Sequence, residues 1–270
     1  MAQAEHSDTV GGCLSRQVVR AERADLRIAL VSGLALLAFW ALIAFVLADP
    51  RRAPGPWLVL PLMAEGLWGG KLLGDLGATL GRVALSFAIA MAVGVAGGVA
   101  LGMSKRADRI FGTWLTVALN VPALVTIVLC YLWVGLNEWA AVIAVALNKI
   151  PMVMVMLREG ARVLDPQLAA MGRVYSMSPS ARLRHIILPQ LAPHILSAAR
   201  AGLAMIWKIV LVVEFLGRSN GIGFRIHMDF QMFNIAGVLA NAFAFIAVML
   251  VIEAGVLAPL ARRASRWRQG

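Results

Sequence analysis

The sequence predicts an all-helical membrane protein with six transmembrane helices and with both termini in the cytoplasm. Of the 270 residues, 60% are hydrophobic and only 14% are charged, an apolar fraction well above that of soluble domains. The apolar residues gather into six runs that approach the roughly 20 residues that a spanning helix needs. The net charge of +11 comes from short basic groups between these runs, which is typical of topology-setting loops and disfavours nucleic-acid binding.

The predicted spans follow one another through residues 28–260, which we interpret as one transmembrane domain. They cover residues 28–48, 79–103, 111–134, 139–157, 195–216 and 235–260. Residues 1–27 form a polar segment that is too long and too mixed in charge to open a signal peptide, so we expect the first span to be uncleaved. Residues 261–270 form a basic tail. Cys13 and Cys130 lie at different levels along the predicted topology, and we expect no disulfide between them.

The basic groups set the predicted orientation. They precede the first span, lie between the second and third, lie between the fourth and fifth, and close the chain. With six spans, all four groups fall on one side of the bilayer, which the positive-inside rule assigns to the cytoplasm. The tight turn at residues 135–138, on the opposite side, carries no cation.

Two features are predicted near the second span. The segment "ADPRRAPGPWLVLP" contains four prolines and cannot be helical throughout, so we expect a link that leads into a short interfacial helix around residues 62–73. Gly94, Gly98 and Gly102 recur every four residues and form a stripe that lets another helix approach closely. This stripe fits general packing inside the bundle as well as a dimer seam.

The connection between the fourth and fifth spans, about residues 158–193, is the longest one. Its "PQLAAMGRVY" segment places Leu168, Met171 and Tyr175 at helical spacing, and Ser178 is a plausible N-cap ahead of Pro179. We therefore expect two short helices that meet near residues 176–178 and form an elbow. Pro189 and Pro193 are expected to stop this elbow and redirect the chain into the fifth span.

The elbow sequence resembles the cytoplasmic "EAA" loop of the permease subunits of ATP-binding cassette (ABC) importers. That motif reads Glu-Ala-Ala, three residues, Gly, nine residues, then Ile-x-Leu-Pro. The matching positions here are Ala170, Met171 and Gly172 for Glu-Ala-Ala, Ser176 for the glycine, and Ile186, Leu188 and Pro189 for the last part. The C-terminal half matches and the N-terminal half departs. In the family the acidic residue contacts the ATPase, so its loss at Ala170 leaves Arg173 and Tyr175 as candidates for that contact.

Three further stretches look like the permeases for nitrate, sulfonate and taurine import. They are "TLGRVALSFAIAMAVGVAGGVALGMSKRADRIF", "NVPALVTIVLCYLWVGLNEWAAV" and "VVEFLGRSNGIGFRI". The resemblance covers roughly residues 54–260 and implies the type I ABC importer permease fold in the bacterial inner membrane. It also implies a homodimer, two ATP-binding subunits and an extracytoplasmic substrate-binding protein. The substrate would be a small anion such as a sulfonate, taurine or nitrate, although related permeases carry thiamine precursors and aromatic carboxylates.

The chain has no phosphate-binding loop of its own. The nearest approach, "EGLWGGKLL", lacks the first glycine and the hydroxyl residue after Lys71. We therefore expect a non-catalytic subunit without cofactor or metal, with ATP and magnesium bound by a partner. His185 has no second metal ligand at a fitting offset.

Coupling to that partner would be mechanical, with the elbow docked in a groove of the ATPase. Leu168, Met171 and Tyr175 would be the apolar anchors of this contact. Arg173, Arg182, Arg184 and His185 would supply the surrounding charge. An equal alternative is that Arg182 and Arg184 are ordinary topology-setting or lipid-facing cations.

Polar residues inside spans are costly in hydrocarbon and tend to face a pathway or a partner. The residues predicted to line the translocation path are Asn120, Pro122, Asn148, Lys208 and Glu214. We expect Asn120 with Pro122 to interrupt the third span, and Asn148 with Lys149 and Pro151 to interrupt the fourth. Lys208 suits an anionic substrate, but it could equally snorkel or pair with a carboxylate of the second subunit.

The fifth span is followed by a glycine-rich segment. Gly217, Gly221 and Gly223 predict a tight extracytoplasmic re-entrant turn near a gate, or simply a short loop. Two other function classes stay open at this point. One is an ion-coupled secondary transporter that uses Glu214 and Lys208 as a relay, and the other is a membrane-embedded or lipid-modifying enzyme.

Overall fold

The computed structural model describes residue 28 and residues 31–257. The predicted cytoplasmic segment 1–27, the basic tail 261–270 and the outer ends of the first and last predicted spans lie outside the described residues. The chain divides into two units, Met1–Leu62 and Met63–Gly270.

The first unit contains the apolar helix Val31–Leu47 and an irregular link. The link folds back so that the Trp40 indole Nε1 donates a hydrogen bond of 3.2 Å to the Pro54 carbonyl. Helix α2, Pro56–Trp68, begins inside the proline-rich segment. The prediction of a helix around residues 62–73 is therefore wrong in its bounds. Helix α2 can begin at Pro56, because the N–H group that proline lacks has no hydrogen-bond partner in the first turn of a helix. Gly70, whose backbone is in the left-handed region, separates α2 from α3.

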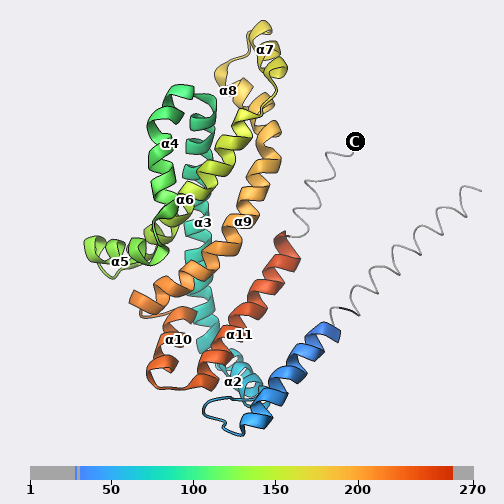
Figure 1. Cartoon of the computed structure of the whole chain (residues 1–270), viewed down its shortest axis with the longest axis vertical. Helices are drawn as coiled ribbons and strands as arrows, with labels where there is room; N and C mark the ends of the chain where they lie inside the picture. The colour runs from blue at the N-terminus through green and yellow to red at the C-terminus, as the bar shows by residue number, and fades with distance from the viewer. Residues whose placement is uncertain (1–27, 29–30, 258–270) are drawn as a thin grey trace, which may run out of the picture. The chain divides into compact units, whose positions relative to one another are not determined.

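The second unit is built from helices, and the described residues contain no strand. Its elements are α3 (Lys71–Met103), α4 (Lys105–Asn120), α5 (Ala123–Val134), α6 (Glu138–Arg162), α7 (Pro166–Val174), α8 (Pro179–Arg182), the π-helical turn η1 (Leu183–Ile187), α9 (Leu188–Gly217), α10 (Ile222–Gln231), α11 (Ile235–Ile252) and the π-helical turn η2 (Glu253–Leu257). Helices α7 and α8 lie at one end of this unit and α10 lies at the other (Figure 1).

Four of the described helices are long and apolar enough to cross a membrane. They are Lys71–Met103, Glu138–Arg162, Pro179–Gly217 and Ile235–Gly255, and a fifth span is formed if the bent pair α4 and α5 counts as one. This confirms the predicted all-helical membrane protein. That the protein has six spans stays a prediction.

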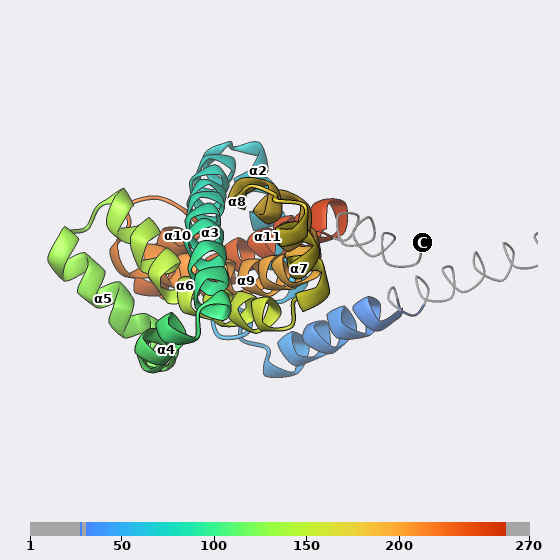
Figure 2. The same cartoon turned by 90° about the horizontal axis from the view of Figure 1, so that it is seen from above.

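The centre of the unit is formed by α3, α6 and α9, which lie next to one another when the molecule is viewed from above (Figure 2). The glycine stripe of α3 faces α6. A Cβ atom at Gly94 would lie 2.6 Å from Val153 Cβ, and one at Gly98 would lie 2.6 Å from the Met154 carbonyl oxygen. The stripe is therefore a packing seam within one subunit, where only glycine allows the two backbones to approach this closely.

The third predicted span is broken, as expected from Asn120 and Pro122. Helices α4 and α5 meet at 96°, because Pro122 lacks an N–H and also disfavours helical backbone at Val121. The fourth span is not interrupted, and that prediction is wrong. Helix α6 runs through Asn148 and the buried Pro151, as transmembrane helices can when neighbouring groups compensate for the lost hydrogen bond.

The prediction that Pro189 and Pro193 stop the elbow is also wrong. The helix continues from Pro179 to Gly217 over 39 residues. Pro189 lies in the first turn of α9, directly after η1, whose wider turn is closed by a bond from the Leu188 N–H to the Leu183 carbonyl. A π-helical turn changes which carbonyl groups the proline ring meets, so the chain passes this proline without leaving the helix.

Candidate functional site

The elbow is held together by close packing between α7 and the start of the long helix. A Cβ atom at Gly172 would lie 2.7 Å from Ile186 Cδ1 and 3.2 Å from Arg182 Cγ. Ile186 is buried as a result. Gly172 and Ile186, two of the predicted coupling residues, are thus brought together inside the elbow and fix the angle at which α7 crosses η1.

The turn between α7 and α8 has a left-handed residue, Ser176, with a φ of 49°. The Met177 N–H bonds the Gly172 carbonyl at 3.0 Å, the bond that ends a helix in a Schellman motif. Glycine is the usual residue at that position, and the EAA motif has glycine where this chain has Ser176. The Ser178 hydroxyl then accepts a bond from the Ala181 N–H at 3.3 Å, which confirms the predicted N-cap.

The outer face of α7 carries large apolar side chains. Leu168, Met171 and Tyr175 are 38%, 48% and 74% exposed, and their spacing places them on one helix face. Of the remaining predicted coupling residues, Ala170 and Arg182 are half-buried, while Leu188 and Pro189 are exposed at the start of α9. The side chain of Arg173 lies outside the described residues. The elbow therefore presents an apolar face with no covering element in the described part of the chain.

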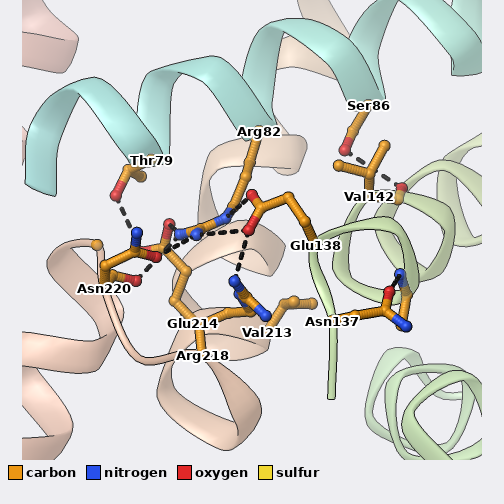
Figure 3. A network of polar contacts seen from close by, with 12 residues as sticks. Thr79, Arg82, Ser86, Asn137, Glu138, Val142, Val213, Glu214, Arg218 and Asn220 are labelled. Atoms are coloured by element: carbon orange, nitrogen blue, oxygen red, sulfur yellow. Dashed lines mark hydrogen bonds and ion pairs between the residues drawn. The ribbon is translucent and has the colours of Figure 1, made fainter. Parts of the chain in front are cut away.

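A buried polar network lies at the end of the unit that carries α10 (Figure 3). Its centre is Arg82 of α3, which is only 3% exposed. The Arg82 Nη1 atom lies 2.5 Å from Glu214 Oε1 of α9, and the Arg82 Nε atom lies 2.6 Å from Glu138 Oε1 at the start of α6. The same guanidinium also donates a bond of 3.1 Å to the Asn220 carbonyl. One side chain thus joins α3, α6, α9 and the turn that follows α9.

Glu214 is fully buried, and its carboxylate has three partners. Besides Arg82, it accepts hydrogen bonds of 2.9 Å from the Thr79 hydroxyl and 2.9 Å from the Gly223 N–H. Gly221 has a φ of 104°, and a Cβ atom there would lie 2.5 Å from the Glu214 carboxyl carbon. A tight turn is present here, because Gly221 lets the backbone close directly over this carboxylate. Its extracytoplasmic position near a gate stays a prediction.

The network extends outward through two further ion pairs. Arg218 Nη2 lies 2.6 Å from Glu138 Oε2, and Arg225 of α10 pairs with Asp75 of α3. Asp75 also accepts a bond of 2.8 Å from the Gly221 N–H. Sequence reasoning identified Glu214 but missed its partners. The signal for Arg82 was present, since it is the one charged residue within the second predicted span, residues 79–103.

The five predicted path residues do not form one cluster with shared bonds. Asn120 is exposed and donates to the Thr116 carbonyl of its own helix at 2.8 Å, and Pro122 lies at the break between α4 and α5. Asn148 is half-buried on α6. Lys208 is exposed on α9 and has no ion pair with a described residue, whereas Glu214 is enclosed. Among the described residues, no three His, Cys, Asp or Glu side chains gather as a metal site would require.

Comparisons with known proteins identify the family to which the chain is similar. Residues 87–263 match the model of the family described as "Binding-protein-dependent transport system inner membrane component". The chain is 32% identical over 190 residues to a putative aliphatic sulfonates transport permease protein, SsuC, of Escherichia coli, covering 70% of this chain and 72% of the relative. It is 26% identical over 237 residues to the taurine transport system permease protein TauC of the same species, covering 86% of each chain. A structure of the MetNI methionine ABC transporter in an inward-facing conformation matches with a TM-score of 0.62 at 16% identity, covering 73% of this chain and 97% of the other.

Breaking the Arg82–Glu214 pair is expected to destabilise the protein strongly. We expect Arg82→Met to lower the free energy of unfolding by about 3 kcal/mol, because the Glu214 carboxylate is left buried without its cation. Glu214→Gln should cost less, about 1–2 kcal/mol, since Arg82 keeps Glu138 as a partner. Unfolding in mixed micelles followed by circular dichroism measures these changes. The exposed Arg109→Met variant is the control, and purely additive effects in the Arg82→Met/Glu214→Gln double variant would contradict the coupling.

Replacing Ser176 by glycine is expected to stabilise the elbow by about 0.5–1 kcal/mol, because glycine adopts the left-handed conformation without the steric cost that serine bears. Slower hydrogen exchange at the Met177 N–H would report the gain. Ser178→Ala is the matched comparison two residues away, where loss of the cap should cost about 1 kcal/mol and speed exchange in α8. Equal exchange rates in the Ser176→Gly variant and the parent protein would show that the turn is unstrained.

Proposed function

This chain belongs to the family of binding-protein-dependent transport system inner membrane components, and we propose that it forms the path for a small anion of the sulfonate or taurine type. It is a permease subunit of an ABC importer and a multi-pass membrane protein. The anion class is supported by the names of the two relatives, which state aliphatic sulfonates and taurine. Nitrate, a thiamine precursor and an aromatic carboxylate are the alternatives that the sequence resemblance leaves open.

The proposed assembly is a homodimer in the bacterial inner membrane, with two ATP-binding subunits on the cytoplasmic side and a substrate-binding protein outside. Residues 28–260 would form the transmembrane domain, and the segments 1–27 and 261–270 would be cytoplasmic. ATP and magnesium would bind the ATPase, and this chain would be non-catalytic without a cofactor of its own. The absence of a phosphate-binding loop in the sequence supports this division of labour.

The coupling role of the elbow, about residues 158–193, is carried by one observation. The apolar face of Leu168, Met171 and Tyr175 stands exposed on α7, as a helix-in-groove contact requires. Because α7 packs on η1 through Gly172, and η1 continues into α9 without a break, a force on this face would act on the whole 39-residue helix. Closure of two ATPases around nucleotide would thus tilt α9 as a lever.

Transport in proteoliposomes tests the proposal as a whole. We expect uptake of radiolabelled taurine or ethanesulfonate only when this chain is reconstituted with its ATPase, its binding protein and ATP, because the chain itself cannot hydrolyse ATP. The control uses an ATPase that binds but does not hydrolyse ATP. Uptake driven by a proton gradient in the absence of the ATPase would support the secondary transporter instead.

The docking role of the elbow has a sharper test. Met171→Asp combined with Tyr175→Asp should lower co-purification of the ATPase at least tenfold, because buried apolar anchors carry much of the energy of such contacts. The variant should still insert in the membrane, since both side chains are exposed. Phe233→Asp, which places aspartate at an 87% exposed position at the other end of the unit, is the control. Unchanged co-purification of the double variant would refute the docking role.

A further inference from the structure

Lys149 is a buried cation that has no carboxylate partner among the described residues. It is 6% exposed on α6, and its Nζ atom contacts Met205 Sδ of α9 at 3.2 Å. No ion pair with a described residue is formed. A thioether is a weak acceptor, and an ammonium group has three protons to donate. Burying such a group without compensation is costly, so a structural role alone does not account for Lys149.

A second lysine, Lys208, lies on α9 one turn after the methionine that Lys149 contacts. Lys208 follows Met205 by three residues, which places their Cβ atoms about 5–6 Å apart on one face of α9. Lys149 contacts Met205, so both lysines have this methionine as a neighbour. A Cβ atom added at Gly202, one turn before Met205, would meet nothing within 4 Å. There is therefore free space on α9 next to the methionine.

Both lysines lie near half depth of the predicted bilayer. Lys149 is 11 residues from Glu138, the first residue of α6, and Lys208 is 9 residues from Gly217, the last residue of α9 (149 − 138 and 217 − 208). At 1.5 Å per residue these separations correspond to roughly 17 Å and 14 Å. The hydrocarbon core is about 30 Å thick. Two cations at similar distances from the helix ends, on adjoining helices, would create a positive site where an anion would otherwise meet its highest barrier.

Three buried or half-buried arginines contrast with Lys149. Arg82, Arg158 and Arg225 each pair with a carboxylate within the subunit. The charge of each of these arginines is balanced within the subunit, where the ion pairs join neighbouring helices. Lys149 and Lys208 lack such a partner among the described residues, which is the state expected of groups that wait for a mobile counter-ion.

We propose that Lys149 and Lys208 form an oxyanion-binding site in the translocation path, with Met205 as the flexible side chain that covers Lys149 between substrates. This inference rests on the proposed function and adds the groups that bind the substrate. The ligand is a small organic oxyanion whose head group accepts hydrogen bonds from both ammonium groups, as a sulfonate does. The unbranched thioether of Met205 can move aside without strain because it has three rotatable bonds.

The test uses the complete importer in proteoliposomes, with taurine and ethanesulfonate as probes. Lys149→Met keeps an unbranched side chain, one atom shorter, and removes its charge, and Lys149→Arg keeps the charge. We expect Lys149→Met and Lys208→Met each to lower the initial rate of uptake at least tenfold, and Lys149→Arg to stay within about threefold of the parent. ATP hydrolysis stimulated by the binding protein should persist in all three. Lys71→Met, at an exposed helix end, is the control and should leave uptake unchanged.

Each other result has a defined meaning. If the parent importer takes up both probes and the two Lys→Met variants do so equally well, this inference fails while the proposed function stands. If the parent takes up neither probe with ATP, the anion function fails and the inference fails with it. If Lys208→Met separates the dimer on size-exclusion chromatography, Lys208 pairs with a carboxylate of the second subunit and the two-lysine site is refuted. Loss of uptake in Lys149→Arg as well, together with loss of stimulated ATP hydrolysis, would assign Lys149 a structural role.

Discussion

The ion pair between Arg82 and Glu214 is the constraint on which one end of this permease depends. Both groups are withdrawn from solvent, and such charges are tolerated only when they are paired and their remaining hydrogen-bonding capacity is filled. The guanidinium therefore also requires Glu138 and Asn220, and the carboxylate requires Thr79 and Gly223. Satisfying these two groups fixes the start of α6, the end of α9, the turn after it and the entry into α10.

The continuity of α9 connects this end to the elbow. The helix that begins at Pro179 passes two prolines and ends next to the network. A helix that is pinned at Glu214 and packed at Ile186 transmits displacement better than a hinged one, because neither end can move without disturbing contacts made by the other helices. The expected bend at Pro189 would have divided this lever. The π-helical turn instead places the irregularity inside the elbow, where α7 packs on it through Gly172.

The apolar runs predicted the helices well, because hydrocarbon thickness imposes a length that is visible in the sequence. Features that depend on neighbouring residues, such as the Ser178 cap and the helix break at Pro122, could also be predicted from the sequence. The partner of Glu214 was not, since Arg82 lies 132 residues away and no local spacing connects them. The prolines of α6 and α9 were misjudged for a related reason. Whether a proline interrupts a transmembrane helix depends on what packs around it, and that is set by the tertiary structure.

The difference between the elbow sequence and the EAA motif has a physical explanation. The position of the motif's acidic residue, Ala170, is half-buried, so a charged side chain there would have to reach around its neighbours to meet a partner. Met171 and Tyr175 are much more exposed than Ala170. A contact between this elbow and an ATPase would thus depend more on buried apolar area than on one carboxylate. Such a contact would respond weakly to salt, because screening acts on exposed charges and leaves apolar burial almost unaffected.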